Sequence, residues 1–428
     1  MILSRLTRVK QFNQWGETKR HPQGTGPNAT SSNTAARDMI QESVPNLQER
    51  LFTVLTTYNN FTAFSNKKWD PKSQDADSIE SIHDRIHLAV GRRGHMEYIV
   101  LSSFDPVFFL HHTNVDRLTA IWQALHPDSY VTRWEAVEPS FTINVGDVQD
   151  ANSPLTPFYN SQGRFWTSNS SRETTVFGYE YADTAGFRLS SGGDGEAVGR
   201  LRETVRRKYG GQSPSELRGN QNRKRSPANM AMAEAGRRRF REGANKKSGK
   251  FVPEISYKSS VPCPEASAVI KDGYYREWVV NVKVRNSDIH GPSSVLVFLG
   301  DLPDSPKDWS DAPNLVGACA LFSMDGVSNP NNEVAGTIPL TGALMKMVSG
   351  KLVDSMNPED ITSYLKKHLH FTVAGAGGDI ALNPRRMPGL EIQVVTARVQ
   401  NPKSDREFPV REDYEFIFSM TEHAKAST

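Results

Sequence analysis

One stretch of this 428-residue chain, Glu80–Arg117, most constrains what the chain can fold into. It reads ESIHDRIHLAVGRRGHMEYIVLSSFDPVFFLHHTNVDR and holds five of the 11 histidines. His83 and His87 are four residues apart, so on a helix their imidazoles project from one face, about one turn apart. That spacing suits two ligands of one metal ion.

A second helix is predicted to follow. Asp105 can cap free backbone amides and Pro106 suits a first helical position, so the pair predicts a helix start before VFFLHHTNVDRLTAIWQAL. His111 and His112 are neighbours and point about 100° apart around such a helix. Only one of them can therefore join a site with the first pair, and the other must pack or hydrogen-bond elsewhere.

Two further carboxylates bear on the choice of site. Asp116 follows His112 by four residues on the same helix face, where it can orient a ligand imidazole or bind a neighbouring Arg. Asp84 stands where a zinc protease needs Glu, directly after the first histidine of the pair, which excludes that enzyme class. A histidine pair alone is more often structural than metal-binding, so the hypothesis depends on the whole stretch.

The strings HDRIH, GHM and FDPVFFLHHTNVDRL, in this order, resemble the copper B half of the tyrosinase, catechol oxidase and hemocyanin family of type-3 copper proteins. The resemblance implies that copper is bound by His83, His87 and His112, with His111 as a structural neighbour. It also implies that Glu80 holds a water that helps to deprotonate phenols, and that Asp84 tunes substrate access and monophenol activity.

Members of this family use two copper ions and O2 to hydroxylate monophenols at the ortho position and to oxidise o-diphenols to o-quinones, which feed melanin-type pigment. Three neutral imidazoles suit both oxidation states of copper. The expected partners are therefore a phenolic substrate and O2. Two alternatives stay open: a hemocyanin-like oxygen-binding protein, and a metal-poor pseudoenzyme.

The copper A half, which should precede these strings with three more histidines, is missing. Upstream of His83 the chain has one histidine, His21, and no cysteine. Either the sequence begins inside its gene or it is a shortened paralogue. In both cases at most one copper site is evident, and we expect this chain alone to lack phenol oxidation.

Length and composition predict a two-domain globular protein. A chain of this length exceeds the size of one hydrophobic core. Its 37% hydrophobic and 23% charged residues are typical of soluble proteins, and no apolar run approaches the roughly 20 residues of a membrane helix. Two cysteines and no signal-peptide pattern favour a cytoplasmic location.

The expected fold class is two-domain α plus β, in four segments. Residues 1–35 are a polar loop, and residues 36–190 form a helical copper domain, a partial four-helix bundle with a helix starting around Pro45. Residues 191–250 are a basic flexible linker. Residues 251–428 contain the short β-branched runs WVVNVKV, SSVLVFLG, LHFTVAG, LEIQVVTARV and DYEFIFSM, which predict an antiparallel β-sandwich.

Two of these segments carry further expectations. Residues 200–250 hold 16 Lys or Arg against four Glu, but no aromatic interleaving, which favours an exposed, protease-sensitive linker over a nucleic-acid interface. The VFGYEYADT string resembles the Tyr-x-Tyr mark that closes the family's copper domain, on Tyr179 and Tyr181. The C-terminal segment resembles the domain that covers the copper cleft of fungal tyrosinases and often places an aromatic side chain in it.

Overall fold

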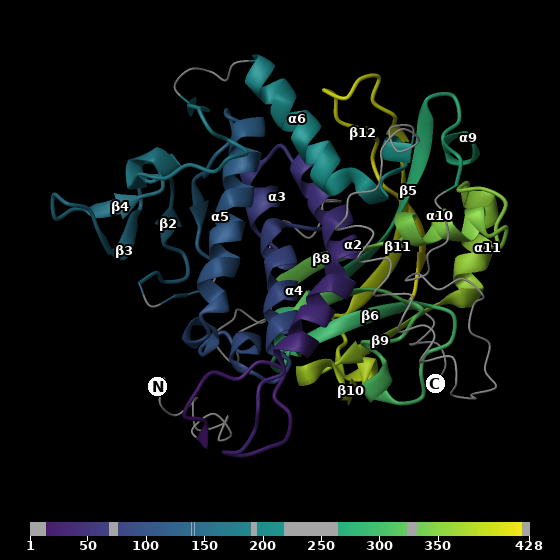
Figure 1. The fold of residues 1–428 in the computed structure, drawn as a ribbon, viewed down its shortest axis with the longest axis horizontal. Helices are drawn as coiled ribbons and strands as arrows, with labels where there is room; N and C mark the ends of the chain where they lie inside the picture. The colour runs from purple at the N-terminus through teal and green to yellow at the C-terminus, as the bar shows by residue number, and fades with distance from the viewer. Residues whose placement is uncertain are drawn as a thin grey trace.

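The architecture is a helical body packed against a body of antiparallel sheets (Figure 1). The computed structural model describes residues 14–67, 76–137, 139–140, 142–189, 195–217, 264–322 and 332–421. The predicted order, helices first and antiparallel sheets second, is confirmed. Among the described residues, no helix has the length and apolar character needed to span a membrane.

Among the described residues, the helical body contains helices from both sides of a long excursion that separates α5 from α6. They are α2 (Asn33–Thr57), α3 (Phe61–Ser65), α4 (Ile79–Gly91), α5 (Val107–Leu125) and α6 (Gly195–Tyr209), with the turns η3 (His95–Glu97) and η4 (Ser102–Phe104) between α4 and α5. Trp122 of α5 anchors the core of this body. Its ring stacks on Phe64 at 4.4 Å between centroids, and its indole N–H donates to the Tyr58 carbonyl at 2.6 Å.

The predicted start of the first helix near Pro45 is wrong, because α2 begins at Asn33. The Ser32 side chain caps the helix by accepting a hydrogen bond from the Ala35 amide. Pro45 lies inside α2, where it lacks the amide hydrogen that an interior position normally donates. Packing of the buried face, which includes Met39, offsets this loss.

The predicted flexible linker over residues 191–250 is wrong for residues 195–217. This part forms α6 and two short turns, and it packs on the helical body. Leu201 and Val205 of α6 are buried in the helical core. Basic side chains dominate the composition here, so the few apolar residues on one face of α6 gave a weak signal. Residues 218–250 lie outside the described residues.

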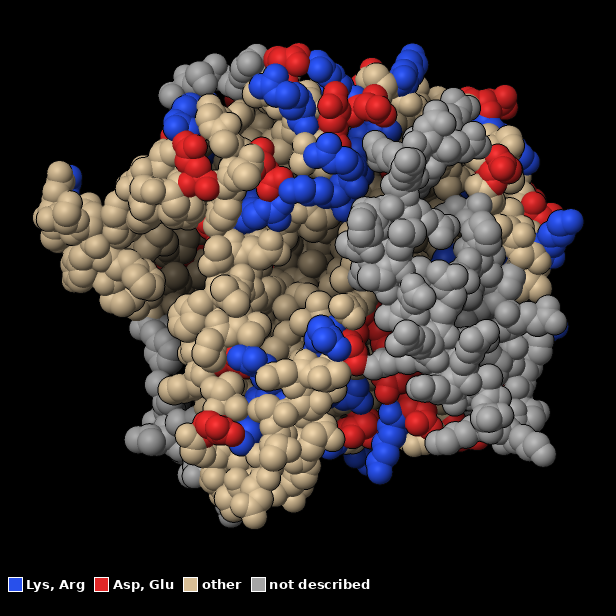
Figure 2. Space-filling model, viewed as in Figure 1, with Lys and Arg blue, Asp and Glu red and all other residues tan. Residues whose placement is uncertain are grey.

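Charges on the surface around α6 are paired rather than uniformly basic. Arg406 from the sheet body binds Glu196 at 2.7 Å and Glu203 at 2.9 Å. On the face shown in Figure 2, Lys and Arg side chains lie among Asp and Glu side chains over the described residues. The surface around the described part of α6 therefore carries both signs of charge in ion pairs.

Two small antiparallel ribbons interrupt the segment that was predicted to be helical. They are β1 (Trp134–Glu135) with β2 (Val148–Gln149), and β3 (Pro154–Tyr159) with β4 (Phe165–Thr167), followed by the turn η5 (Thr174–Phe177). In Figure 1 they project to the left of α5. The helical prediction for residues 36–190 therefore holds for α2 to α5 but not for this excursion.

The sheet body contains two antiparallel sheets. One has the strand order β10-β9-β6-β7, and the other has the order β12-β11-β5-β8, with β13 also pairing with β11. The strands are β5 (Tyr274–Arg285), β6 (Ser293–Leu299), β7 (Leu315–Leu321), β8 (Glu333–Pro339), β9 (Leu369–Ala374), β10 (Ala381–Leu382), β11 (Glu391–Gln400), β12 (Val410–Arg411) and β13 (Glu415–Ser419). Every β-run quoted from the sequence coincides with a strand. The helices α9 (Ala266–Val269), α10 (Thr341–Ser349) and α11 (Pro358–His368) in this segment were not predicted.

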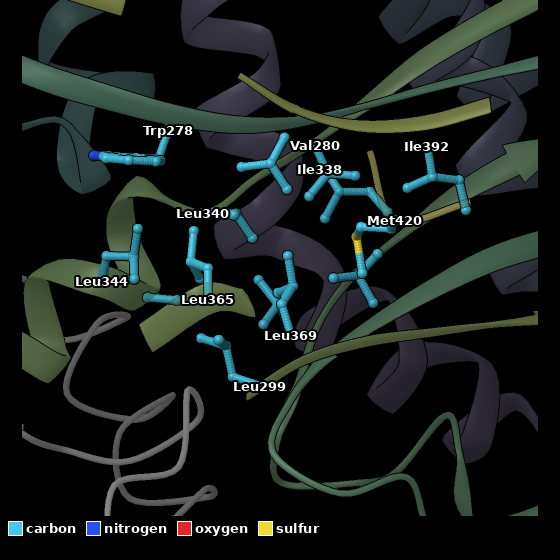
Figure 3. Packing of buried hydrophobic residues seen from close by; sticks show 14 of the residues in the cluster. Trp278, Val280, Leu299, Ile338, Leu340, Leu344, Leu365, Leu369, Ile392 and Met420 are labelled. Carbon is cyan, nitrogen blue, oxygen red and sulfur yellow. The ribbon is translucent and has the colours of Figure 1, made fainter. Parts of the chain in front are cut away.

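Both sheets contribute to one hydrophobic core. Figure 3 shows Val280 of β5 beside Ile338 of β8, and Trp278 of β5 on the side where Leu344 of α10 and Leu365 of α11 lie. All of these side chains are fully buried. Burial of such side chains contributes about 1.5–3 kcal/mol each relative to exposure.

The helical body lies against β7 and β8 through α2 and α4. Gly336 of β8 permits this close approach, because a Cβ atom there would lie 2.5 Å from the Ser81 hydroxyl of α4 and 2.6 Å from the Cys319 sulfur of β7. Asp77, just before α4, accepts a hydrogen bond from Thr337 of β8 at 2.6 Å. The sheets therefore cover the face of α4 that carries buried side chains.

Candidate metal centre

Helix α4 presents the first two histidines. Ser78 caps it by accepting a hydrogen bond from the Ser81 amide at 3.1 Å, and Arg92 ends it in the left-handed conformation. His83 and His87 stand one turn apart on this helix, as predicted, and their Nε2 atoms are 2.9 Å apart. The capping residues thus define the bounds of α4, and the four-residue spacing places His83 and His87 on one face of it.

Helix α5 supplies the third histidine. Asp105 accepts a hydrogen bond from the Val107 amide at 2.9 Å, and Pro106 occupies the cap position, so the predicted helix start is confirmed. Asp105 is itself fixed by a two-pronged ion pair with Arg20, with both distances 2.7 Å. This pair ties the N-terminal segment to the start of α5.

The three histidines that were predicted as ligands converge on one point. The Nε2 atom of His112 lies 3.3 Å from that of His83 and 3.3 Å from that of His87. A tetrahedral metal ion bound about 2.0–2.1 Å from each imidazole nitrogen would hold those nitrogens about 3.3 Å apart. The three side chains therefore fit one metal ion with little rearrangement.

The hydrogen bonds of the outer ring nitrogens leave the inner ones free to bind. His83 Nδ1 lies 3.0 Å from a carboxylate oxygen of Asp84, and His87 Nδ1 lies 3.0 Å from the Met96 carbonyl. Because an ionised carboxylate and a carbonyl only accept hydrogen bonds, both Nδ1 atoms carry the proton. The lone pair of each ring is then on Nε2, directed at the shared point.

His111 has a different environment from His112. Its ligand atoms lie within 4.8 Å of those of His83 and His87, so it also belongs to a possible three-histidine group. However, its Nε2 lies 3.2 Å from the His83 carbonyl and donates to it, so only its Nδ1 could bind a metal ion, whereas His112 directs Nε2 at the same point as His83 and His87. Its ring stacks on His83 with centroids 5.0 Å apart. The geometry favours His112 as the third ligand and His111 as packing.

The environment of three of these imidazoles favours the neutral form that metal ligation requires. Burial, reinforced by His83, lowers the pKa of His87 to about 4 and that of His111 to about 3. Burial and His83 also lower the pKa of His112. Unprotonated rings at neutral pH offer their lone pairs without first losing a proton.

Asp84 and Glu80 contact a lysine that was not predicted from the sequence as part of the site. Lys67, just after α3, places its ammonium 2.5 Å from Asp84 and 3.8 Å from Glu80, and its backbone amide donates to Glu80 at 3.0 Å. Burial opposes the charge on both Lys67 and Asp84, but their mutual attraction raises the pKa of Lys67 and lowers that of Asp84. Asp84 thus lies behind His83, while Glu80 keeps a partly exposed carboxylate.

Aromatic rings form the walls around the histidines. Phe108 stacks on His112 with centroids 4.0 Å apart, whereas Phe109 is 61% exposed. Phe322, at the end of β7, stacks on His87 with centroids 5.2 Å apart. Sequence reasoning expected an aromatic side chain from the C-terminal part but could not identify Phe322, because nothing local to that residue marks it.

Among the described residues, Asp116 contacts two tyrosines and neither a ligand histidine nor an Arg. It accepts hydrogen bonds from the hydroxyls of Tyr179 at 2.8 Å and Tyr181 at 2.6 Å. Arg117 instead binds Asp183, with its Nε atom 2.7 Å from the carboxylate. The two tyrosines therefore fasten the segment after the ribbons onto α5, a structural role that matches the sequence interpretation of the Tyr-x-Tyr string.

Comparisons with known protein families match both bodies. Residues 4–125 match the model of the common central domain of tyrosinase, and residues 277–394 match that of the tyrosinase C-terminal domain. The first match contains α2 to α5 with all four clustered histidines. The second contains most of both sheets.

Individual relatives agree with these matches. A tyrosinase of Neurospora crassa is 29% identical over 84% of this chain and 61% of its own length. A tyrosinase of Podospora anserina is 31% identical over 79% of this chain and 62% of its own length. The chain thus spans about three fifths of these relatives. The structure of recombinant mushroom tyrosinase superposes with a TM-score of 0.68 at 21% identity, over 95% of this chain and 68% of that one, which shows a shared fold.

Proposed function

Since the chain belongs to the tyrosinase family, whose members are copper proteins, we propose that it is the copper B half and C-terminal domain of a copper-dependent phenol oxidase. The observation that carries this proposal is the set of three Nε2 atoms, 2.9–3.3 Å apart, on His83, His87 and His112. When bound, copper supplies the redox chemistry by which O2 oxidises a phenol to an o-quinone.

In this proposal the chain's own residues hold and orient the site. The Asp84 carboxylate and the Met96 carbonyl fix the rings of His83 and His87 through their Nδ1 protons. Glu80, one turn before His83 and partly exposed, accepts the phenol proton through a water. Phe322 and Phe108 restrict access to the histidines from two sides. Asp84 then affects the substrate only through His83, rather than by contact.

We further propose that phenol oxidation requires a second three-histidine half. Among the described residues, the one group of side chains that could hold a metal ion lies in this histidine cluster of α4 and α5. Beside it the surface is unusually apolar: Phe104 is 68% exposed, Phe109 61% and Leu110 73%. Exposed patches of this kind mark contact surfaces. This face of α5 is therefore the place where we expect the second half to pack.

The finer architecture follows the same reasoning. The two antiparallel sheets share one core, which supports a β-sandwich as the form of the sheet body. Helices α2, α4, α5 and α6 pack around one helical core, and α5 keeps an apolar face open, which supports a partial four-helix bundle completed by another segment. In this proposed architecture, the β-sandwich covers the face of α4 that carries the copper-binding histidines.

The test combines metal analysis with turnover. We expect the purified chain to bind one copper ion and to show no oxygen uptake with catechol. A fusion that adds the part of the Podospora anserina relative not covered by this chain should bind two copper ions and oxidise catechol. Oxygen uptake by the chain alone would contradict the need for a second half. A fusion with two copper ions and no oxidation of mono- or diphenols would contradict phenol oxidation.

A mononuclear copper protein without oxidase activity is the second candidate, and the contacts of His21 favour it. The Nε2 atom of His21 donates to the Ala89 carbonyl at 2.6 Å, so this nitrogen is engaged outside the histidine cluster. Copper bound by the chain with no activity in any fusion would support this candidate. A copper-dependent rate of catechol oxidation in the fusion would exclude it.

A further inference from the structure

Lys67 occupies an unusual position between the metal centre and the sheet body. Its side chain is 7% exposed, and its ammonium donates to Asp84 at 2.5 Å and to the Phe322 carbonyl at 2.8 Å. A lysine ammonium has three donors and no acceptor, so these bonds use two of its donors, and Glu80 lies within ion-pair distance at 3.8 Å. Lys67 belongs to neither of the histidine helices nor to the sheets.

The two acceptors of Lys67 lead to two different histidines. Asp84 uses its other oxygen to accept from His83 Nδ1 at 3.0 Å. Phe322 places its ring on His87, with centroids 5.2 Å apart and planes 23° apart. One ammonium thus connects the carboxylate behind one histidine to the residue that covers the other.

The backbone of Lys67 strengthens this connection. Its carbonyl accepts a hydrogen bond from the Ala335 amide of β8 at 3.0 Å. Phe322 and Ala335 lie at the end of β7 and near the start of β8, so one residue binds both strands. Leu88 of α4 packs with Phe322 and Ala320 directly beside these contacts.

We propose that Lys67 is a positioning residue that fixes the end of β7 over the metal centre and couples its order to occupation of the histidines. This inference rests on the proposed function, because it takes the histidines to be the metal site. A bound metal ion immobilises His83 and His87, which in turn hold Asp84 and the Phe322 ring. With those partners fixed, less entropy is lost when Lys67 and the end of β7 are held.

Linkage makes the coupling measurable from either side. If metal binding orders the end of β7, then an ordered β7 end must favour metal binding by the same free energy. Removal of the Lys67 ammonium should therefore loosen the end of β7 and also make it insensitive to metal. A residue that served only to stabilise the fold would cause the first change but not the second.

The test needs variants that leave no buried charge unpaired. Lys67→Met/Asp84→Asn removes both charges but retains an acceptor for His83 Nδ1, whereas Lys67→Met/Asp84→Leu removes that acceptor too. Lys307→Met, at an exposed position of the sheet body, is the matched control. Each full-length variant is titrated with Cu2+, and hydrogen exchange of the peptide covering residues 315–322 is measured with and without the metal.

We expect exchange at the end of β7 to be about tenfold faster in both double variants, from loss of a charge-assisted hydrogen bond, and unchanged in Lys307→Met. Cu2+ should slow this exchange in the wild type and not in Lys67→Met/Asp84→Asn, whose Cu2+ affinity should fall by about the factor by which Cu2+ slows the exchange in the wild type. Lys67→Met/Asp84→Leu should bind about tenfold to hundredfold more weakly, as is typical when the partner of a ligand histidine is lost.

Equal exchange in the wild type and both double variants would overturn the proposal. So would an equal effect of Cu2+ on the wild type and on Lys67→Met/Asp84→Asn. If the wild type binds no Cu2+, the proposed function fails, yet the metal-free exchange rates still show whether Lys67 holds the end of β7. Failure of the inference and failure of the proposed function therefore give different results.

Discussion

Two buried polar clusters lie where the helical body meets the sheet body, and their groups are satisfied to different degrees. In the Lys67 cluster, the ammonium and both oxygens of Asp84 have partners. In the Glu49 cluster, which comprises Glu49, Arg50, Asp77 and Glu277, one oxygen of Glu49 and one terminal nitrogen of Arg50 have no hydrogen-bond partner within the part of the chain that the structure describes. These four residues line a small cavity away from the histidines.

The difference shows how the two clusters serve the fold. The Lys67 cluster is rigidly bonded and lies behind the histidines, where small displacements would disturb a metal site. The Glu49 cluster contains the Arg50–Asp77 ion pair and a second carboxyl, Glu49. Burial and the nearby Glu277 oppose ionisation of Glu49 and raise its pKa to about 8. One cluster positions ligands, and the other makes the contact between the bodies sensitive to pH.

The largest effect is expected from the ion pair in the Glu49 cluster. Arg50 is fully buried and binds Asp77 with contacts of 2.8 and 2.6 Å. Arg50→Ala would leave Asp77 buried without its cation, which should lower the free energy of unfolding by about 3–5 kcal/mol in urea denaturation. Arg37→Ala, whose side chain is 65% exposed, should change it by less than about 0.5 kcal/mol. Similar losses for both variants would show that the buried Arg50–Asp77 ion pair contributes no more to stability than an exposed arginine does.

A smaller effect, of opposite sign, is expected at Glu49. In the unfolded chain this carboxyl ionises near its ordinary pKa of 4.5, but in the folded protein it ionises near 8. Folding is therefore favoured by this group below pH 4.5, and that contribution is lost as the pH rises to about 8. Glu49→Gln removes the ionisation and should stabilise the protein by about 1–3 kcal/mol at pH 8, with little change at pH 4.5.

Denaturation curves of Glu49→Gln between pH 4.5 and pH 8.5 provide the measurement. Glu359→Gln, an exposed substitution on α11, is the matched control and should follow the wild type at every pH. Parallel pH profiles for Glu49→Gln and the wild type would show that Glu49 is not the source of pH sensitivity, and would remove the contrast between the two clusters.

The smallest effect is expected where a carboxylate is exposed. Asp116 lies on the surface of α5 and is bound by the hydroxyls of Tyr179 and Tyr181. Tyr181→Phe should cost about 0.5–1.5 kcal/mol, because water can replace the lost hydrogen bond to Asp116. If Tyr181→Phe lowered the free energy of unfolding in urea as much as Arg50→Ala does, solvent exposure would not explain the different contributions of Asp116 and Asp77.

Local patterns in the sequence predicted much of the metal centre. The spacing of His83 and His87, the Asp105–Pro106 helix start and the angle between His111 and His112 are all properties of single helices, so they could be read from short stretches. Five strands of the sheet body, β5, β6, β9, β11 and β13, were predicted for the same reason. Their alternating and β-branched runs are local signals.

What the sequence did not indicate depends on contacts between distant segments. Lys67 and Phe322 are 255 positions apart, and no local pattern distinguishes this lysine from its neighbours. The start of α2 was misplaced because tertiary packing tolerates Pro45 inside the helix. The helix in residues 195–209 was hidden by its basic composition, although its apolar face docks on the helical core.

The central claim is that one copper ion is held by His83, His87 and His112, and titration of single-histidine variants with Cu2+ tests it most directly. We predict one Cu2+ bound per wild-type chain and an affinity lowered by more than about a hundredfold in His112→Ala. His111→Ala should bind Cu2+ within about fivefold of wild type while losing about 1–2 kcal/mol of stability, because its hydrogen bond to the His83 carbonyl is lost. Loss of Cu2+ binding in His111→Ala together with normal binding in His112→Ala would contradict the account.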